Sequence, residues 1–147
     1  MALCESVAAR LREQNCVYST VTVGIRTNDL ASFDRQLKLS RPTDSTLTIW
    51  EAAMDIFRRS HTDGRPVRSL SVKVSGLAPA DEMTQLSLFP EERKAQHRAD
   101  IDRTIDKIRA KYGYFSIRRA ITLVDPALDL DAKGDHIIHP VGFLGTL

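Results

Sequence analysis

Residues 17–26 alternate between apolar and polar side chains, and this pattern narrows the choice of fold more than any other feature of the chain. A period of two residues is typical of a β-strand with one buried face and one exposed face. The expected inner face carries Val17, Ser19, Val21, Val23 and Ile25, and the expected outer face carries Tyr18, Thr20, Thr22, Gly24 and Arg26. Residues 33–40 and 67–75 alternate in the same way, so the sequence predicts three half-buried strands. The turn formers Asn28 and Asp29 join the first two as a hairpin.

Two helices are predicted to cover the apolar side of this sheet. Residues 2–15 repeat apolar side chains at four-residue spacing, as a helix with one buried face does. A second apolar stripe follows candidate N-cap residues at 41–45 and stops before turn formers at 61–64; it consists of Leu47, Trp50, Met54 and Phe57. A long helix is expected at 91–112. The fold class is therefore α+β: a small antiparallel or mixed sheet, two helices packed on one face, and a C-terminal helical tail.

Composition sets the broad class. The chain has 147 residues, 42% of them hydrophobic and 27% charged, which fits one globular domain with an appendage. The net charge of +2 does not by itself indicate nucleic acid. Two cysteines, Cys4 and Cys16, are too few for a disulfide framework or a structural zinc site, so we expect structural thiols and a cytoplasmic setting. No apolar run is long enough for a membrane span, and the helix-like start at Met1 suggests a chain cut from something longer.

The open face of the predicted sheet carries hydroxyl, lysine and arginine side chains. These groups donate hydrogen bonds to phosphate oxygens without reading base sequence. Aromatic residues are sparse there beyond Tyr18, which argues against base stacking and favours contact with a duplex backbone. An ordinary solvated face explains the same pattern, because most open sheets place polar residues outward. Both interpretations stay open on composition alone.

Residues 85–89 read Gln-Leu-Ser-Leu-Phe and form a short linear anchor after a loop-like stretch at 76–81. Exposed leucine and phenylalanine side chains in a loop are unfavourable unless something covers them. The cover is either the protein's own core or a partner.

Residues 5–75 resemble the little-finger domain of Y-family translesion DNA polymerases. The resemblance rests on residues 6–12 (SVAARLR), 21–26 (VTVGIR) and 67–77 (VRSLSVKVSGL). Residues 85–89 resemble the pentapeptide that binds the bacterial sliding clamp. Residues 105–113 (IDKIRAKYG) and 117–120 (IRRA) are similar to the tail of bacterial members, in the polymerase IV-like and polymerase V-like branches.

This resemblance implies a non-catalytic DNA-binding and clamp-tethering domain of an error-prone polymerase. The residues it places against DNA are Thr22, Arg26, Lys38, Arg41, Arg68, Ser69, Ser71 and Lys73, and those it places against the clamp are Gln85, Leu86, Ser87, Leu88 and Phe89. It divides the chain into a little-finger-like domain at 1–78, a linker with the clamp motif at 79–92, and a helix and tail at 93–147. The palm domain and its Mg²⁺-binding carboxylates are not expected in this sequence, so the isolated chain is expected not to polymerise.

The first strand of the little finger is also expected to be missing, which would leave one sheet edge open. An open edge invites pairing with a second copy, as in a strand-exchanged homodimer, or with the chain's own residues 137–143.

Two other functions remain open on the sequence. The chain could be a stand-alone adaptor that binds the clamp without touching DNA. It could also be a small enzyme that uses His136 and His139, although these lack further ligands at zinc spacing. The aspartates at 100, 102 and 106 interleave with basic residues, and we expect ion pairs along the helix surface rather than a metal site.

Overall fold

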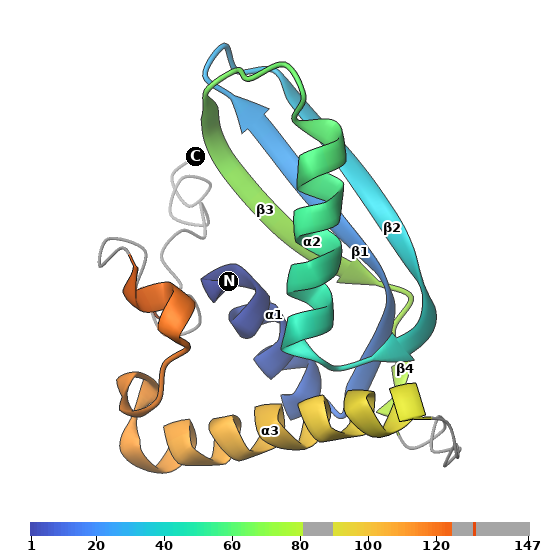
Figure 1. Cartoon of the computed structure of the whole chain (residues 1–147), viewed down its shortest axis with the longest axis vertical. Helices are drawn as coiled ribbons and strands as arrows, with labels where there is room; N and C mark the ends of the chain where they lie inside the picture. Colours follow the sequence, from blue (N-terminus) through green and yellow to red (C-terminus); the bar gives the residue numbers. More distant parts are fainter. Residues whose placement is uncertain (81–89, 125–130, 132–147) are drawn as a thin grey trace, which may run out of the picture.

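A computed structural model describes residues 1–80, 90–124 and 131 of the chain (Figure 1). The expected α+β class is confirmed. In chain order the elements are α1 (Ala2–Glu13), β1 (Cys16–Thr27), β2 (Ser32–Thr43), α2 (Thr46–Ser60), β3 (Val67–Ser75), β4 (Ala78–Pro79) and α3 (Pro90–Tyr112), followed by the 3-10 turns η2 (Tyr114–Ser116) and η3 (Ala120–Leu123). No helix among the described residues is long and apolar enough to cross a membrane.

β1 is the central strand of an antiparallel sheet with the order β2-β1-β3. A tight turn joins β1 to β2, where the Thr27 N–H donates to the Ala31 carbonyl at 3.0 Å. Among the described strands, none pairs with the second edge of β3. Residues 137–143, suggested above as a filler for that edge, lie outside the described residues.

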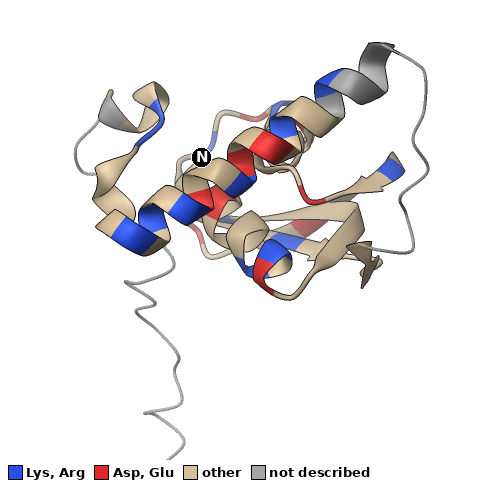
Figure 2. Cartoon of the chain, turned by 90° about the horizontal axis from the view of Figure 1, so that it is seen from below, with Lys and Arg blue, Asp and Glu red and all other residues tan. Residues whose placement is uncertain are grey.

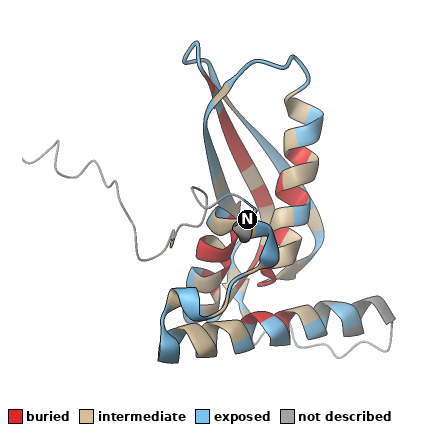
Figure 3. Cartoon of the chain, turned by 60° about the vertical axis from the view of Figure 1, so that its left-hand side comes forward, coloured by how far each residue is buried: buried red, intermediate tan, exposed pale blue. Residues whose placement is uncertain are grey.

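The helices α1 and α2 lie side by side on one face of the sheet, and the core fills the space between (Figure 1). Val21, Val23 and Ile25 of β1 are each no more than 3% exposed. They pack against Leu11 of α1 and Ile49 of α2, and the buried residues follow β1 and the inner sides of both helices (Figure 3). On the opposite face of the sheet, the described residues place no helix, and we call this side the open face.

The alternation at 67–75 assigns Leu70 to the apolar face, and the register does place it beside Ile25 on the covered face. It is nevertheless 46% exposed. β3 is an outer strand of the sheet, and in Figure 1 α1 lies against its later part while its first part extends above α1.

Tyr18 was predicted on the open face, and this prediction is wrong. The β1–β2 register is irregular at this point: the step from Tyr18 to Thr20 on β1 spans Thr43 to Lys38 on β2, and the alternation of faces does not carry across such a bulge. Tyr18 is therefore fully buried in the core, where its hydroxyl donates to the Ser45 carbonyl at 3.1 Å. Burial raises the pKa of this hydroxyl far above its ordinary value, so Tyr18 remains a donor.

The start of α2 agrees with the sequence. Ser45 is the N-cap, with extended backbone, and its Oγ accepts from the Thr48 N–H at 3.4 Å. Capping satisfies one of the N–H groups that the first turn leaves without a helical partner. The helix ends at Ser60, next to the predicted turn formers.

Residues 76–80 were expected to be a loop, but they return to the sheet. Gly76 has a φ of +66°, and a Cβ there would collide with the Ser19 side chain, so the reversal requires glycine. β4 then pairs with Cys16 and Val17, and the Ala80 N–H donates to the Asn15 carbonyl at 2.9 Å. The chain is thus fixed against the start of β1 immediately before residue 81.

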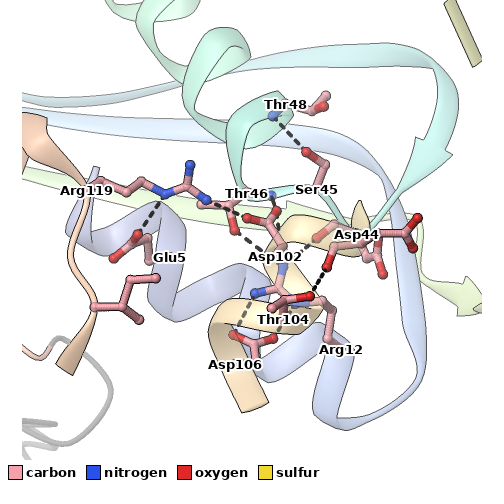
Figure 4. Close-up of polar contacts among 12 residues, drawn as sticks. Glu5, Arg12, Asp44, Ser45, Thr46, Thr48, Asp102, Thr104, Asp106 and Arg119 are labelled. Carbon is pink, nitrogen blue, oxygen red and sulfur yellow. Dashed lines mark hydrogen bonds and ion pairs between the residues drawn. The ribbon is translucent and has the colours of Figure 1, made fainter. Parts of the chain in front are cut away.

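Buried charges attach α3 to α1 and to the first turn of α2 (Figure 4). Asp102 is 3% exposed. It accepts from the Thr46 backbone N–H at 2.8 Å, and Arg12 of α1 lies 3.6 Å away. Arg119 donates to its other oxygen. Asp102 therefore acts as a second cap for α2, supplied by a helix far away in the sequence.

Glu5 forms the second buried anchor, near the C-terminal end of α3. It is 4% exposed and accepts from Arg109 at 3.2 Å, Arg119 at 2.8 Å and the Tyr114 hydroxyl at 3.1 Å. Burial raises the pKa of Tyr114 to about 12, so its hydroxyl keeps the proton that it donates. Arg119 contacts both Glu5 and Asp102, which joins the two anchors into one cluster.

The aspartates of α3 do form ion pairs, as predicted, but most of their partners lie outside α3. Asp100 does pair with Arg103 on the same helix, at 3.5 Å. Asp102 and Asp106 instead pair with Arg12 of α1, because the helix face that carries them is docked rather than solvated. Acidic and basic residues both occur along α3 (Figure 2). In the described part of the chain, no group of three His, Cys, Asp or Glu side chains could hold a metal ion.

We predict that Asp102→Ala lowers the free energy of unfolding by about 3 kcal/mol, because it leaves buried Arg12 and the Thr46 N–H short of a partner. Asp100→Ala, two residues away, is the matched control, since Asp100 is 59% exposed. The control is expected to change stability by less than about 1 kcal/mol. Urea denaturation of the two variants measures the difference. Equal losses in both would show that the Asp102 cluster does not hold α3.

A candidate nucleic-acid interface on the open face of the sheet

Four cross-strand rows build the open face of the sheet. In each row a residue of β1 lies between its partner on β2 and its partner on β3. The rows are Lys38-Thr20-Ser75, Gln36-Thr22-Lys73, Asp34-Gly24-Ser71 and Ser32-Arg26-Ser69. Directly opposed residues share a face, and the residues between these rows on β1 face the core, so all four rows point away from the helices.

The chemistry of these rows suits an anionic backbone. They present the cations Arg26, Lys38 and Lys73 among serine and threonine hydroxyls, and one carboxylate, Asp34. With Tyr18 in the core, the described strands place no aromatic side chain in these rows. Hydroxyls and cations without aromatic platforms can position a phosphate backbone, but they cannot stack bases.

The register brings together most of the residues predicted to face DNA: Thr22, Arg26, Lys38, Ser69, Ser71 and Lys73. Arg41 and Arg68 are different. Arg41 lies in the stretch of β2 that the register skips between Lys38 and Thr43, and Arg68 lies between the partners of Arg26 and Thr27. Both are exposed, but alternation does not assign them to a face, because a bulge breaks the period of two.

Asp34 is the residue of this face that the sequence reading missed. Lys73 Nζ donates to Asp34 Oδ2 at 3.1 Å, although the two residues lie on the strands that flank β1. Gly24 lies between Asp34 and Ser71, with Lys73 in the neighbouring row, and a Cβ on Gly24 would be 2.7 Å from Asp34 Oδ1 and 2.5 Å from Ser71 Oγ. The signal that could have found this contact is the glycine in mid-strand, since glycine there often marks close approach by other groups.

A second charge cluster closes the end of the sheet at the β1–β2 turn. Arg65 contacts Asp29 at 3.1 Å and Asp63 at 2.6 Å. A hydrogen bond from the Thr27 hydroxyl is the main cause that lowers the pKa of Asp29, and one from Arg65 lowers the pKa of Asp63. Two carboxylates therefore offset the Arg65 charge, and this end of the sheet offers less positive potential than its sequence suggests.

A hollow of about 370 Å³ lies on the helix side, between α1 and the chain after α3. Its lining includes Glu5, Arg109 and Tyr114, which bind one another. These groups are committed to holding α3, so the hollow belongs to the fold rather than to a binding site.

Of the remaining candidate residues from the sequence, the cysteines lie in or next to the core, and the others lie outside the described residues. Cys4 is buried, and burial raises the pKa of its thiol, which fits a structural role; Cys16 is half-buried. The clamp-motif residues 85–89 and the histidines 136 and 139 lie outside the described residues. The described neighbours of the clamp motif are β4 on one side and α3 on the other.

Residues 1–88 match the model of the impB/mucB/samB family C-terminal domain. The chain is 38% identical over 127 residues to a protein named DNA polymerase IV from Acetivibrio thermocellus, covering 86% of this chain and 32% of that protein. It is 35% identical to DNA polymerase IV 2 of Bacillus subtilis, covering 84% of this chain and 29% of the relative. It is also 33% identical to the putative UV-damage repair protein UvrX of Bacillus subtilis, covering 91% of this chain and 32% of the relative.

The chain thus spans about a third of the length of these relatives. The family match covers the sheet and both of its helices, and it includes residues 6–12, 21–26 and 67–77, on which the resemblance to the little finger rested. The chain therefore belongs to the impB/mucB/samB family, as a C-terminal domain of the Y-family DNA polymerases.

Proposed function

We propose that this chain binds the backbone of duplex DNA through the open face of its sheet and tethers a translesion polymerase to the sliding clamp through residues 85–89. The observation that carries the first half is the set of four rows, which gathers Arg26, Lys38 and Lys73 among hydroxyls on the face that none of the described helices covers. Contacts of this kind supply affinity without sequence readout, as a polymerase that follows any template needs.

The position of the pentapeptide supports the tethering half of the proposal. Residue 80 is hydrogen-bonded to Asn15, and α3 is attached through Asp102 and Glu5, so both neighbouring segments are docked on the same domain. A partner that binds residues 85–89 would be held close to the sheet. Leu88 and Phe89 could each contribute about 1.5–3 kcal/mol in a partner pocket. Ordering costs offset much of this, and roughly micromolar affinity is expected, which suits an exchangeable tether.

Nucleotide addition is proposed for the parent polymerase and not for this chain. The chain corresponds to about a third of its relatives, and the family resemblance assigns the Mg²⁺-binding carboxylates to the palm domain rather than to the little finger. The alternative function is a stand-alone adaptor that occupies the clamp. Duplex affinity of the open face is the property that separates the two.

We predict that Lys73→Glu combined with Arg26→Glu weakens duplex binding by at least about 100-fold and lowers the salt slope by about two, one unit for each lost phosphate contact. The matched control is Arg58→Glu with Arg59→Glu on α2, which changes the net charge equally on the other side of the sheet. Fluorescence anisotropy with a labelled duplex at several salt concentrations gives both quantities. Equal losses in both double variants would mean that the open face is not the interface.

Leu88→Ala with Phe89→Ala is expected to reduce clamp affinity at least about 100-fold, because both apolar anchors are lost. Duplex affinity and the unfolding midpoint should stay unchanged. Ser87→Ala, in the polar spacer of the same motif, should retain clamp binding. Calorimetry with purified clamp and thermal unfolding measure these effects. Unfolding of the double variant would instead assign Leu88 and Phe89 to the domain's own core, and clamp binding without duplex affinity would favour the adaptor.

A further inference from the structure

We propose that the hollow above Gly24 is a phosphate-binding subsite and that Asp34 acts as its built-in competitor, holding Lys73 until a DNA phosphate takes its place. This inference rests on the proposed DNA-binding function of the open face and names one contact within it. Asp34 is the single carboxylate in the four rows. Its neighbours would bind the phosphate, whereas Asp34 would compete with it.

The first step is the reach of Asp34 across the central strand. Asp34 is on β2 in the row of Gly24, and Lys73 is on β3 in the row of Thr22, so their contact runs diagonally across β1. Neighbouring strands are about 4.8 Å apart, so the two backbones are separated by at least roughly 10 Å. A side chain at position 24 would crowd the path of Asp34 across the strand. Gly24 leaves only backbone there, and Asp34 Oδ1 occupies the space next to the missing Cβ. The carboxylate can therefore meet Lys73 Nζ at 3.1 Å over the strand.

The second step is the lining of the space around that contact. A hollow of about 200 Å³ opens on the outer face over Gly24. Its polar lining consists of Arg26, Ser32, Asp34, Ser69 and Ser71. One guanidinium and three hydroxyls converge there, and these are the donors that a phosphate oxygen accepts from. Asp34 is the one lining group that, ionised, offers acceptors alone, and its carboxylate is the closest side-chain analogue of the phosphate that the other groups fit.

The third step is that the ion pair between Asp34 and Lys73 is weak, so a phosphate can replace the carboxylate. The two side chains are 54% and 62% exposed, so water and salt keep their attraction weak. A phosphate that enters the hollow gains Arg26 and the serine hydroxyls, which line it. Lys73 does not line the hollow, but its Nζ lies 3.1 Å from the Asp34 carboxylate that does, so a phosphate in place of that carboxylate would gain Lys73 as well. In the absence of DNA, Asp34 neutralises Lys73 and keeps it beside the hollow.

The test is duplex binding by the full chain with Asp34→Asn, measured by fluorescence anisotropy at low salt. Asp55→Asn is the matched control, because Asp55 is also an exposed carboxylate in an ion pair, with Arg59 at 2.8 Å on α2. We expect Asp34→Asn to tighten duplex binding about fivefold relative to this control, the upper range for release of one exposed ion pair.

Repeating the Asp34→Asn test in a second variant distinguishes competition for Lys73 from general repulsion of DNA by the Asp34 charge. In Lys73→Gln, the carboxylate has no lysine to hold, so adding Asp34→Asn should change affinity by less than about twofold. An equal gain in both backgrounds would mean that Asp34 only repels DNA and would overturn the proposal. Equal affinities of Asp34→Asn and Asp55→Asn, with the wild type binding duplex, would overturn it while leaving the proposed function in place. Failure of the wild type to bind duplex at low salt would overturn both.

Discussion

The structure depends on β1, which is hydrogen-bonded along both edges and buried on one side only. Val21, Val23 and Ile25 must face the helices, because placing these side chains in water would cost several kcal/mol. The period of the strand then sends Thr22, Gly24 and Arg26 outward, with their partners on β2 and β3 beside them. A shift of the register by one residue would exchange the two faces, so the same burial that stabilises the core also assembles the open face.

The attachment of α3 follows a different principle from the core. Its contacts to α1 and α2 are mainly charged groups, several of them buried, and Ala99 adds a small apolar contact. Buried charges are costly unless each is paired and hydrogen-bonded. Here Asp102 and Glu5 each have three partners. Such a cluster adds less net stability than an apolar interface, but it accepts one geometry, because any displacement leaves a buried charge unpaired.

Local patterns predicted the elements, the inner face of β1 from Val21 onward and most of the outer face. They failed where distant residues decide the outcome. The bulge that turns Tyr18 inward depends on pairing with β2, and Asp102 could not be matched to Arg12 or Thr46 from helical spacing alone. Asp34 was missed because its partner lies two strands away and meets it only over a glycine. Sequence periodicity reports which side a residue faces, whereas these contacts depend on which segments become neighbours.

The start of the proposed tether and the hollow with Asp34 lie at different places along the same strand. β4, which leads to the pentapeptide, pairs with Cys16 and Val17, whereas the hollow lies at Gly24. At about 3.3 Å per residue, β4 and the hollow are separated by roughly 23–26 Å along β1. A hydrogen-bonded central strand is among the most rigid parts of a domain, so the fold fixes this distance. In the proposed arrangement, the tether to the clamp therefore starts in the opposite half of β1 from the hollow that takes the DNA phosphate.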